Sequence, residues 1–198
     1  MTGITTAGSY FDDLRRTTER ISAVVVEHIA SVLLNAYYHD RTIFLFGNGG
    51  SAALASHLAC DLGKGTVNGS SKRFRVLALT DNVPLMTAWA NDTDYESVFA
   101  GQLANFVRRD DVAFAISGSG NSNNVLRALR VAREAGAITV GLSGFQGGKM
   151  KDLCDVCMIV PSDNMQIIED LHLCISHALF TVIRTKLSES TLSLAKSG

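Results

Sequence analysis

Two pairs of titratable residues stand at helical spacing in this chain of 198 residues. His57 and Asp61 are four residues apart, so on a helix both side chains project from one face. Glu169 and His177 are eight residues apart, which turns them by roughly 80° around a helix and lets their side chains converge. Two imidazoles and two carboxylates suit a divalent metal or acid–base catalysis, and they are equally compatible with polar residues satisfied within helix packing. Spacing alone leaves these three interpretations open.

The sequence before His57 predicts a turn that binds anions. A short apolar run over residues 42–46 is typical of a buried strand, and it breaks at Gly47-Asn-Gly-Gly-Ser51 before a helix that ends near Leu62. A strand, a glycine turn and a helix present free backbone N–H groups to a phosphate. The turn also matches the dinucleotide pattern G-x-G-x-x-A, but the acidic residue after the next strand, Asp81, follows over thirty residues later instead of about twenty. The lysine of a P-loop is missing as well.

A second turn, Ser117-Gly-Ser-Gly-Asn-Ser122, follows another apolar run. Its hydroxyls and backbone N–H groups, without Lys or Arg, suit a terminal phosphate monoester held by neutral donors. We expect five strands alternating with helices, at residues 42–46, 74–80, 112–116, 138–142 and 156–160. Such alternation predicts an α/β fold with a parallel, doubly wound sheet in the flavodoxin-like order 2-1-3-4-5. Strands one and three are then neighbours at the switch point, so both turns can face one ligand.

The chain is expected to form a single domain over residues 1–198. Residues 1–40 form N-terminal oligomerisation helices with the first eight residues frayed, residues 41–187 form the α/β core, and residues 188–198 form a disordered tail. The segment Ile21–Tyr38 is apolar on nearly every side, which favours a partner subunit as its cover. The glycine- and serine-rich stretch Gly63–Arg73 is predicted to be a mobile loop. A long helix, Met165–Lys186, carries Glu169 and His177.

Composition narrows the class of protein. A net charge of −1 gives no electrostatic case for nucleic-acid or membrane partners, and no apolar run reaches membrane-spanning length. The N-terminus shows no signal-peptide pattern, so a cytoplasmic location is expected. Cys154-Asp-Val-Cys157 has redox or zinc spacing, but no second CxxC follows, and all four cysteines are expected to be buried core residues.

Three motifs carry a resemblance to a known family: GNGGS at 47–51, SGSGNS at 117–122, and IEDLHLCISH in the last helix. They resemble the sugar isomerase (SIS) domain and, more closely, the phosphoheptose isomerases, which convert sedoheptulose 7-phosphate to D-glycero-D-manno-heptose 7-phosphate. The resemblance extends over nearly the whole chain. It implies a homotetramer with active sites at subunit interfaces and no organic cofactor, because the isomerisation is internally redox-neutral.

The resemblance also implies roles for residues of this chain. The residues implied to line the sugar-phosphate site are Asn48, Gly49, Gly50 and Ser51. Those implied to hold the phosphate are Ser117, Gly118, Ser119 and Ser122, and those near the sugar are Asn91 and Asp92. Zinc is implied at His57, Asp61, Glu169 and His177, with His177 and Asp61 as the acid–base pair.

Three positions depart from the family pattern. The family usually has Glu where this chain has Asp61, Gln where it has Glu169, and Thr where it has Gly118. If the first two changes compensate each other, Glu169 could share the role of base. The expected function is therefore an aldose–ketose isomerase that works through a cis-enediolate. The alternative is a non-catalytic SIS protein, a phosphosugar sensor or a replication-initiator-binding factor, but such proteins lose the titratable set that this chain retains.

Overall fold

The computed structural model describes residues 4–67 and 72–196, with side chains described as far as Glu189. Its centre is a five-stranded parallel sheet in the order β2-β1-β3-β4-β5, which confirms the predicted topology. The strands are β1 (Thr42–Gly47), β2 (Arg75–Ala78), β3 (Val112–Ser117), β4 (Ile138–Ser143) and β5 (Val156–Ile159). Every residue of β3 is buried, as expected for a central strand covered on both faces.

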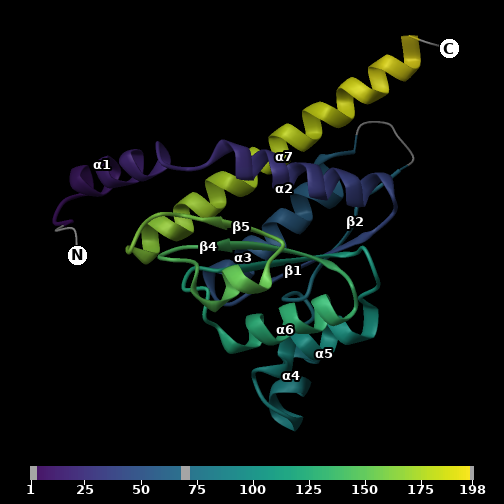
Figure 1. Ribbon diagram of the computed structural model, residues 1–198, viewed down its shortest axis with the longest axis horizontal. Coiled ribbons are helices and arrows are strands. Elements are labelled where there is room, and N and C mark those ends of the chain that lie inside the picture. Colours follow the sequence, from purple (N-terminus) through teal and green to yellow (C-terminus); the bar gives the residue numbers. More distant parts are fainter. Residues whose placement is uncertain (1–3, 68–71, 197–198) are drawn as a thin grey trace.

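Helices cover both faces of the sheet (Figure 1). One layer contains α1 (Ala7–Thr18), α2 (Ala23–Tyr38), α3 (Gly50–Cys60) and α7 (Met165–Lys196). The other contains α4 (Val83–Asp92), α5 (Ser97–Phe106) and α6 (Asn123–Glu134). Alternation along β1 divides the core between the layers: Ile43 and Leu45 join the cluster under α2 and α7, while Phe44 and Phe46 join the cluster under α5 and α6.

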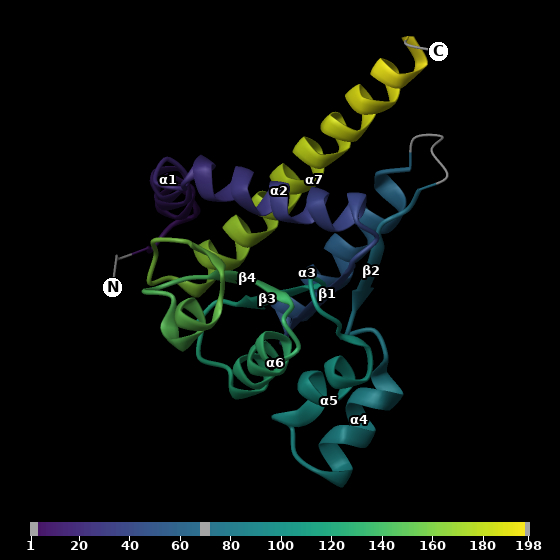
Figure 2. The same ribbon diagram turned by 45° about the vertical axis from the view of Figure 1, so that its right-hand side comes forward.

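Helix α7 is the longest element, and Figure 2 shows it crossing α2 and extending beyond the rest of the fold. By length and composition Met165–Glu189 could span a membrane. It is nevertheless a core helix, because buried residues recur along one stripe and pack with α2: Ile168, Leu171, Ile175, Leu179, Ile183 and Leu187. Residues 188–196 of the predicted tail continue α7, and neither Gly nor Pro interrupts the helix there; residues 197 and 198 lie outside the described residues.

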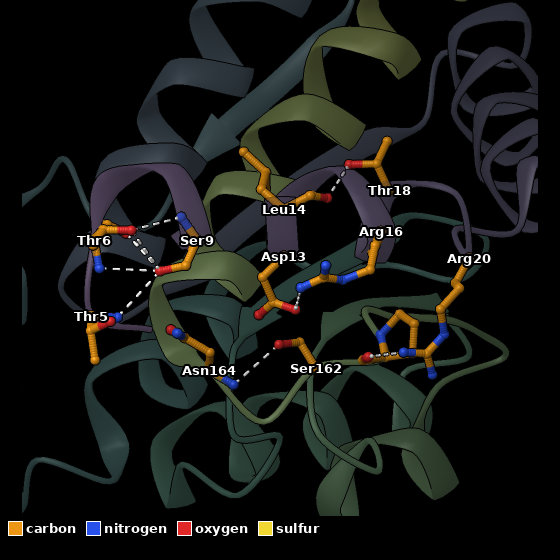
Figure 3. Close-up of polar contacts among 11 residues, drawn as sticks. Thr5, Thr6, Ser9, Asp13, Leu14, Arg16, Thr18, Arg20, Ser162 and Asn164 are labelled. Carbon is orange, nitrogen blue, oxygen red and sulfur yellow. Dashed lines mark hydrogen bonds and ion pairs between the residues drawn. The ribbon is translucent and has the colours of Figure 1, made fainter. Parts of the chain in front are cut away.

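Helix α1 begins earlier than expected and packs against α7. Thr6 and Ser9 form a capping box, so the frayed segment cannot extend to residue 8 (Figure 3). After α1, Arg20 donates a hydrogen bond of 3.1 Å to the Pro161 carbonyl oxygen. The Tyr10 hydroxyl donates to an Asp170 oxygen at 2.5 Å, and burial together with that carboxylate raises the pKa of Tyr10 to about 12. These contacts hold α1 and the residues after it against α7 and against the segment that precedes α7.

Two other expectations are revised. The predicted loop Gly63–Arg73 begins in a π-helical turn, Asp61–Gly65, which continues α3 and is closed by a hydrogen bond from Thr66 Oγ1 to the Leu62 carbonyl; residues 68–71 lie outside the described residues. The apolar side chains of α2 are covered mostly by the chain's own α7 and sheet, and Val24 and Tyr38 remain 79% and 49% exposed. A partner is not needed to cover the rest of this helix.

Candidate active site

The first glycine turn lies where β1 passes into α3. A Cβ on Gly47 would lie 2.6 Å from the Ile116 carbonyl oxygen of the neighbouring strand, so only glycine fits there. Gly49 has φ +55° and precedes the first residue of α3, where a side chain would be strained. The backbone of the first glycine turn therefore passes close to β3, and α3 begins beside the end of that strand.

The serine turn follows β3 and adjoins the first turn. Gly120 has φ +64°, and a Cβ there would collide with the Gly147 carbonyl oxygen. Ser117 Oγ and Ser122 Oγ are 3.4 Å apart. The two turns share a hollow of about 150 Å³, which we call the serine-turn hollow, lined by Asn48, Ser51, Ile116, Ser117, Gly118, Ser119, Ser122, Met165 and Glu169. The sheet order thus brings both glycine turns to one place.

Packing explains why position 118 holds Gly where the family pattern has Thr. A Cβ at this position would lie 2.5 Å from Met165 Sδ and 3.7 Å from Ile168 Cγ2. The flexible side chain of Met165, in the first turn of α7, occupies this space and would have to shift to admit a threonine. Since Met165 also lines the serine-turn hollow, the residues at 118 and 165 are coupled through shared volume.

A group of three titratable residues comes together where α3, the π-turn and α7 meet. His57 Nε2 lies 2.9 Å from His177 Nε2 and 3.4 Å from Asp61 Oδ2. One ligand atom from each residue lies within 4.8 Å of the others, and in the described ranges this is the only group of three or more such residues. Both imidazoles are exposed and the carboxylate is half-buried. Two nitrogens and one carboxylate oxygen are ligand types that suit zinc and leave one position open.

Glu169 lies outside that group, although the sequence placed it with the other three. Its Oε2 lies 3.0 Å from the point where a Cβ on Gly50 would be, so the carboxylate rests against the start of α3. It lines the serine-turn hollow and also a larger hollow of about 330 Å³ that contains His57 and His172. The eight-residue separation from His177 turns Glu169 around α7, so its carboxylate lies beside Gly50 and outside the group of His57, Asp61 and His177.

Asn91 and Asp92 are the candidate residues that do not join the site. They form a hydrogen bond of 2.8 Å with each other at the end of α4, and both are exposed. Asp92 lines a separate hollow with residues of α4 and α5, including Trp89 and Asn105. Within one chain, the end of α4 faces solvent and not the serine-turn hollow.

The cysteines also differ from expectation. Cys60 and Cys174 are exposed, and Cys154 and Cys157 are half-buried, so none is a fully buried core residue. A hydrogen bond between the latter two thiols raises the pKa of Cys154 and lowers that of Cys157. Both sulphur atoms lie about 3 Å from the position that a Cβ on Gly141 would occupy, so there is no room for a side chain at residue 141.

Three residues near the site had no assigned role from the sequence. Asn124 and Tyr95 form hydrogen bonds with Asn48. Helical spacing cannot predict these contacts, because they join segments that are far apart in the sequence. His172 is 1% exposed, and its Nε2 lies 3.1 Å from the Ser143 carbonyl oxygen. Burial lowers the pKa of His172 to about 4, partly opposed by that hydrogen bond. The imidazole is therefore neutral, with Nε2 donating and Nδ1 left without a partner.

Comparisons with known proteins agree with this architecture. The SIS domain model matches residues 9–144. A phosphoheptose isomerase of Helicobacter hepaticus is 37% identical over 165 residues, covering 83% of this chain and 84% of the relative. One from Paramagnetospirillum magneticum is 46% identical over 137 residues, covering 69% and 71%. The solved phosphoheptose isomerase of Neisseria gonorrhoeae superposes with a TM-score of 0.84 at 30% identity, covering 90% of this chain and 96% of that one.

The fold and the matched segment define a SIS-domain protein. Within that class the chain belongs to the phosphoheptose isomerase family, and it is a sugar-phosphate isomerase. These relatives do not favour the alternative of a non-catalytic sensor or initiator-binding factor.

Proposed function

We propose that the chain isomerises sedoheptulose 7-phosphate to D-glycero-D-manno-heptose 7-phosphate. The observation that carries the proposal is the position of Glu169, which lines both the serine-turn hollow and the hollow that contains His57. A phosphate anchored at the serine turn would hold one end of the sugar, and the carbonyl end would then reach the carboxylate and the histidines. Such anchoring converts binding energy into orientation of the reacting carbons.

The reaction needs one base and one group that moves a proton between oxygens. The base removes a proton from C1 of the ketose, and the released electron pair forms the C1–C2 double bond of a cis-enediolate. His177 transfers a proton between the oxygens on C1 and C2. The base then returns its proton to C2, which gives the aldose. Atoms and electrons balance without an external oxidant or reductant, so no organic cofactor is required.

Two carboxylates compete for the role of base. Asp61 lies 3.4 Å from His57 Nε2, within the three-residue group, whereas Glu169 lies outside that group and beside the glycine turns. We therefore assign proton removal to Glu169 and propose that Asp61 and His57 hold a zinc ion, which leaves His177 free to transfer the proton between the substrate oxygens. When bound there, zinc would act as a Lewis acid toward substrate oxygens.

Matched amides separate the two carboxylates. We expect Glu169→Gln to lower kcat by roughly 10²–10⁴-fold while zinc content stays near that of the wild type. Asp61→Asn should instead lower zinc content, measured by elemental analysis of the purified protein. The reverse pattern would assign the base to Asp61.

The substrate is tested directly. Wild-type enzyme is incubated with sedoheptulose 7-phosphate, with chelator or with added zinc, and the aldose is followed by ¹³C NMR. Appearance of the heptose aldose supports the assignment. Its absence under every metal condition, in a protein that is folded by circular dichroism, would overturn it.

We also propose that the enzyme is a homotetramer with active sites at subunit interfaces. Support comes from exposed apolar side chains next to the site and on α2, namely Leu173, Val24 and Tyr38. Leu173 lines the same hollow as Glu169 and His57, so a subunit seated there would enclose that hollow. Light scattering should give about four times the 21.2 kDa chain mass, and a monomer would contradict the proposal.

A further inference from the structure

Asn48, the second residue of the first glycine turn, has its side-chain amide held by two other segments. Its Nδ2 donates to Asn124 Oδ1 at 2.9 Å, and Asn124 Nδ2 donates back to Asn48 Oδ1 at 2.8 Å. The Tyr95 hydroxyl donates to the same Asn48 Oδ1 at 3.0 Å. We call these three residues the Asn48 clamp. It links the end of β1, the segment before α5 and the first turn of α6.

The hydrogen bond from Val125 to Asn124 determines which atom donates in every other hydrogen bond of the clamp. The backbone N–H of Val125 can only donate, and it donates to Asn124 Oδ1 at 2.9 Å. That oxygen must therefore face the nitrogen of Asn48, which sets Asn48 Oδ1 toward Asn124 Nδ2 and Tyr95. Asn124 is 3% exposed, so its amide has little freedom to turn over. Both lone pairs of Asn48 Oδ1 and one of its two N–H bonds are then occupied.

One N–H of Asn48 remains, and Asn48 lines the serine-turn hollow with Ser117, Ser119 and Ser122. We infer that Asn124 and Tyr95 are positioning residues, which lock the Asn48 amide so that it offers a donor and no acceptor to the ligand's phosphate oxygens. Without the clamp the amide could turn over and direct its oxygen at an anion. The identity of the ligand rests on the proposed function, whereas the hydrogen bonds of the clamp do not depend on it.

The location of the clamp explains why donor orientation matters. Glu169 contributes a carboxylate to the same hollow, and among the described residues no Lys or Arg lines it. A phosphate there depends on neutral donors in fixed directions, so the loss of one oriented N–H is not compensated by a nearby positive charge. A positioning role also predicts a particular coupling, because Tyr95 acts on the ligand only through Asn48.

A double-mutant cycle tests this coupling. The dissociation constant of inorganic phosphate and the KM for sedoheptulose 7-phosphate are measured for wild type, Tyr95→Phe, Asn48→Ala and the double variant. Tyr95 is 57% exposed, so loss of its hydroxyl should leave the fold intact. We expect Tyr95→Phe to weaken phosphate binding and raise KM about threefold with kcat within about twofold, and to have no effect in the Asn48→Ala background. Equal weakening in both backgrounds, or none in the wild type, would overturn the inference.

Asn124→Asp probes the orientation itself. It keeps the acceptor for Asn48 Nδ2 and Val125 N but replaces the donor that faces Asn48 Oδ1. Asn123→Asp is the matched control, since Asn123 is exposed on the same helical turn, carries the same change of charge and bonds Glu96 instead of Asn48. We expect Asn124→Asp to weaken phosphate binding about tenfold more than the control. An equal effect of the two variants would contradict the clamp.

The two readouts separate this inference from the proposed function. If sedoheptulose 7-phosphate is not turned over while the phosphate cycle behaves as expected, the assigned substrate is wrong and the clamp stands. If turnover occurs but Tyr95 and Asn48 show no coupling, the clamp is wrong and the substrate stands.

Discussion

Protonation of His172 should make the stability of this enzyme fall in mild acid. The imidazole is 1% exposed, and burial lowers its pKa from 6.5 to about 4. Because the folded pKa is the lower one, the stabilisation is complete above the unfolded pKa. It is lost as the pH falls from about 6.5 toward 4, since the unfolded chain takes up the proton first. At pH 5 the unfolded imidazole is almost fully protonated and the folded one is almost neutral.

The magnitude follows from those two pKa values. Between pH 7 and pH 5, His172 alone should reduce the free energy of unfolding by about 2 kcal/mol. The assay is urea unfolding at one protein concentration, followed by circular dichroism at both pH values. His172→Gln is the matched variant, because its amide can still donate to the Ser143 carbonyl oxygen but does not titrate.

The comparison of the two proteins isolates this residue from other acid-sensitive groups. Wild type should lose about 2 kcal/mol more than His172→Gln between the two pH values, whatever their difference at pH 7. If both lose the same free energy of unfolding, His172 is either protonated in the folded state or solvated, and the reasoning from burial fails.

Three further predictions concern the site and its supports. His177→Ala should lower turnover by at least about 10²-fold while the dissociation constant of inorganic phosphate stays within about twofold, and unchanged turnover in a kinetic assay would remove His177 from the mechanism. Gly118→Thr should destabilise the protein by no more than about 1 kcal/mol, because the flexible Met165 side chain that it meets can shift, and the double variant with Met165→Ala should recover most of that in thermal unfolding; no recovery would refute the shared-volume explanation. Tyr10→Phe removes the hydrogen bond to Asp170 and should cost about 1 kcal/mol in urea unfolding, whereas Phe11→Tyr, at an exposed neighbouring ring, should cost little.

The local sequence pattern determined most of the strands, helices and turns of this protein. The apolar run in β1 has its neighbours packed on opposite faces, and the glycines at 47 and 49 are required by close approach and by positive φ. The apolar runs and the glycine turns are patterns of adjacent residues, so the sequence alone predicted the strands and both turns, and the usual doubly wound order then predicted the sheet order. Element ends were less certain, because they depend on caps such as Thr6 with Ser9 and on the continuation of α7 past residue 188.

Tertiary structure decided which residues share a site. The family resemblance implied that Glu169 lies with His57, Asp61 and His177, but the packing of α7 on α3 directs its carboxylate toward Gly50. The contacts of Asn48 with Tyr95 and Asn124 join segments separated by 47 and 76 residues, and no local pattern reports them. Sequence fixes the chemical groups and the elements that carry them. The directions of side chains at the meeting point of three elements depend on how those elements pack, which only the folded chain determines.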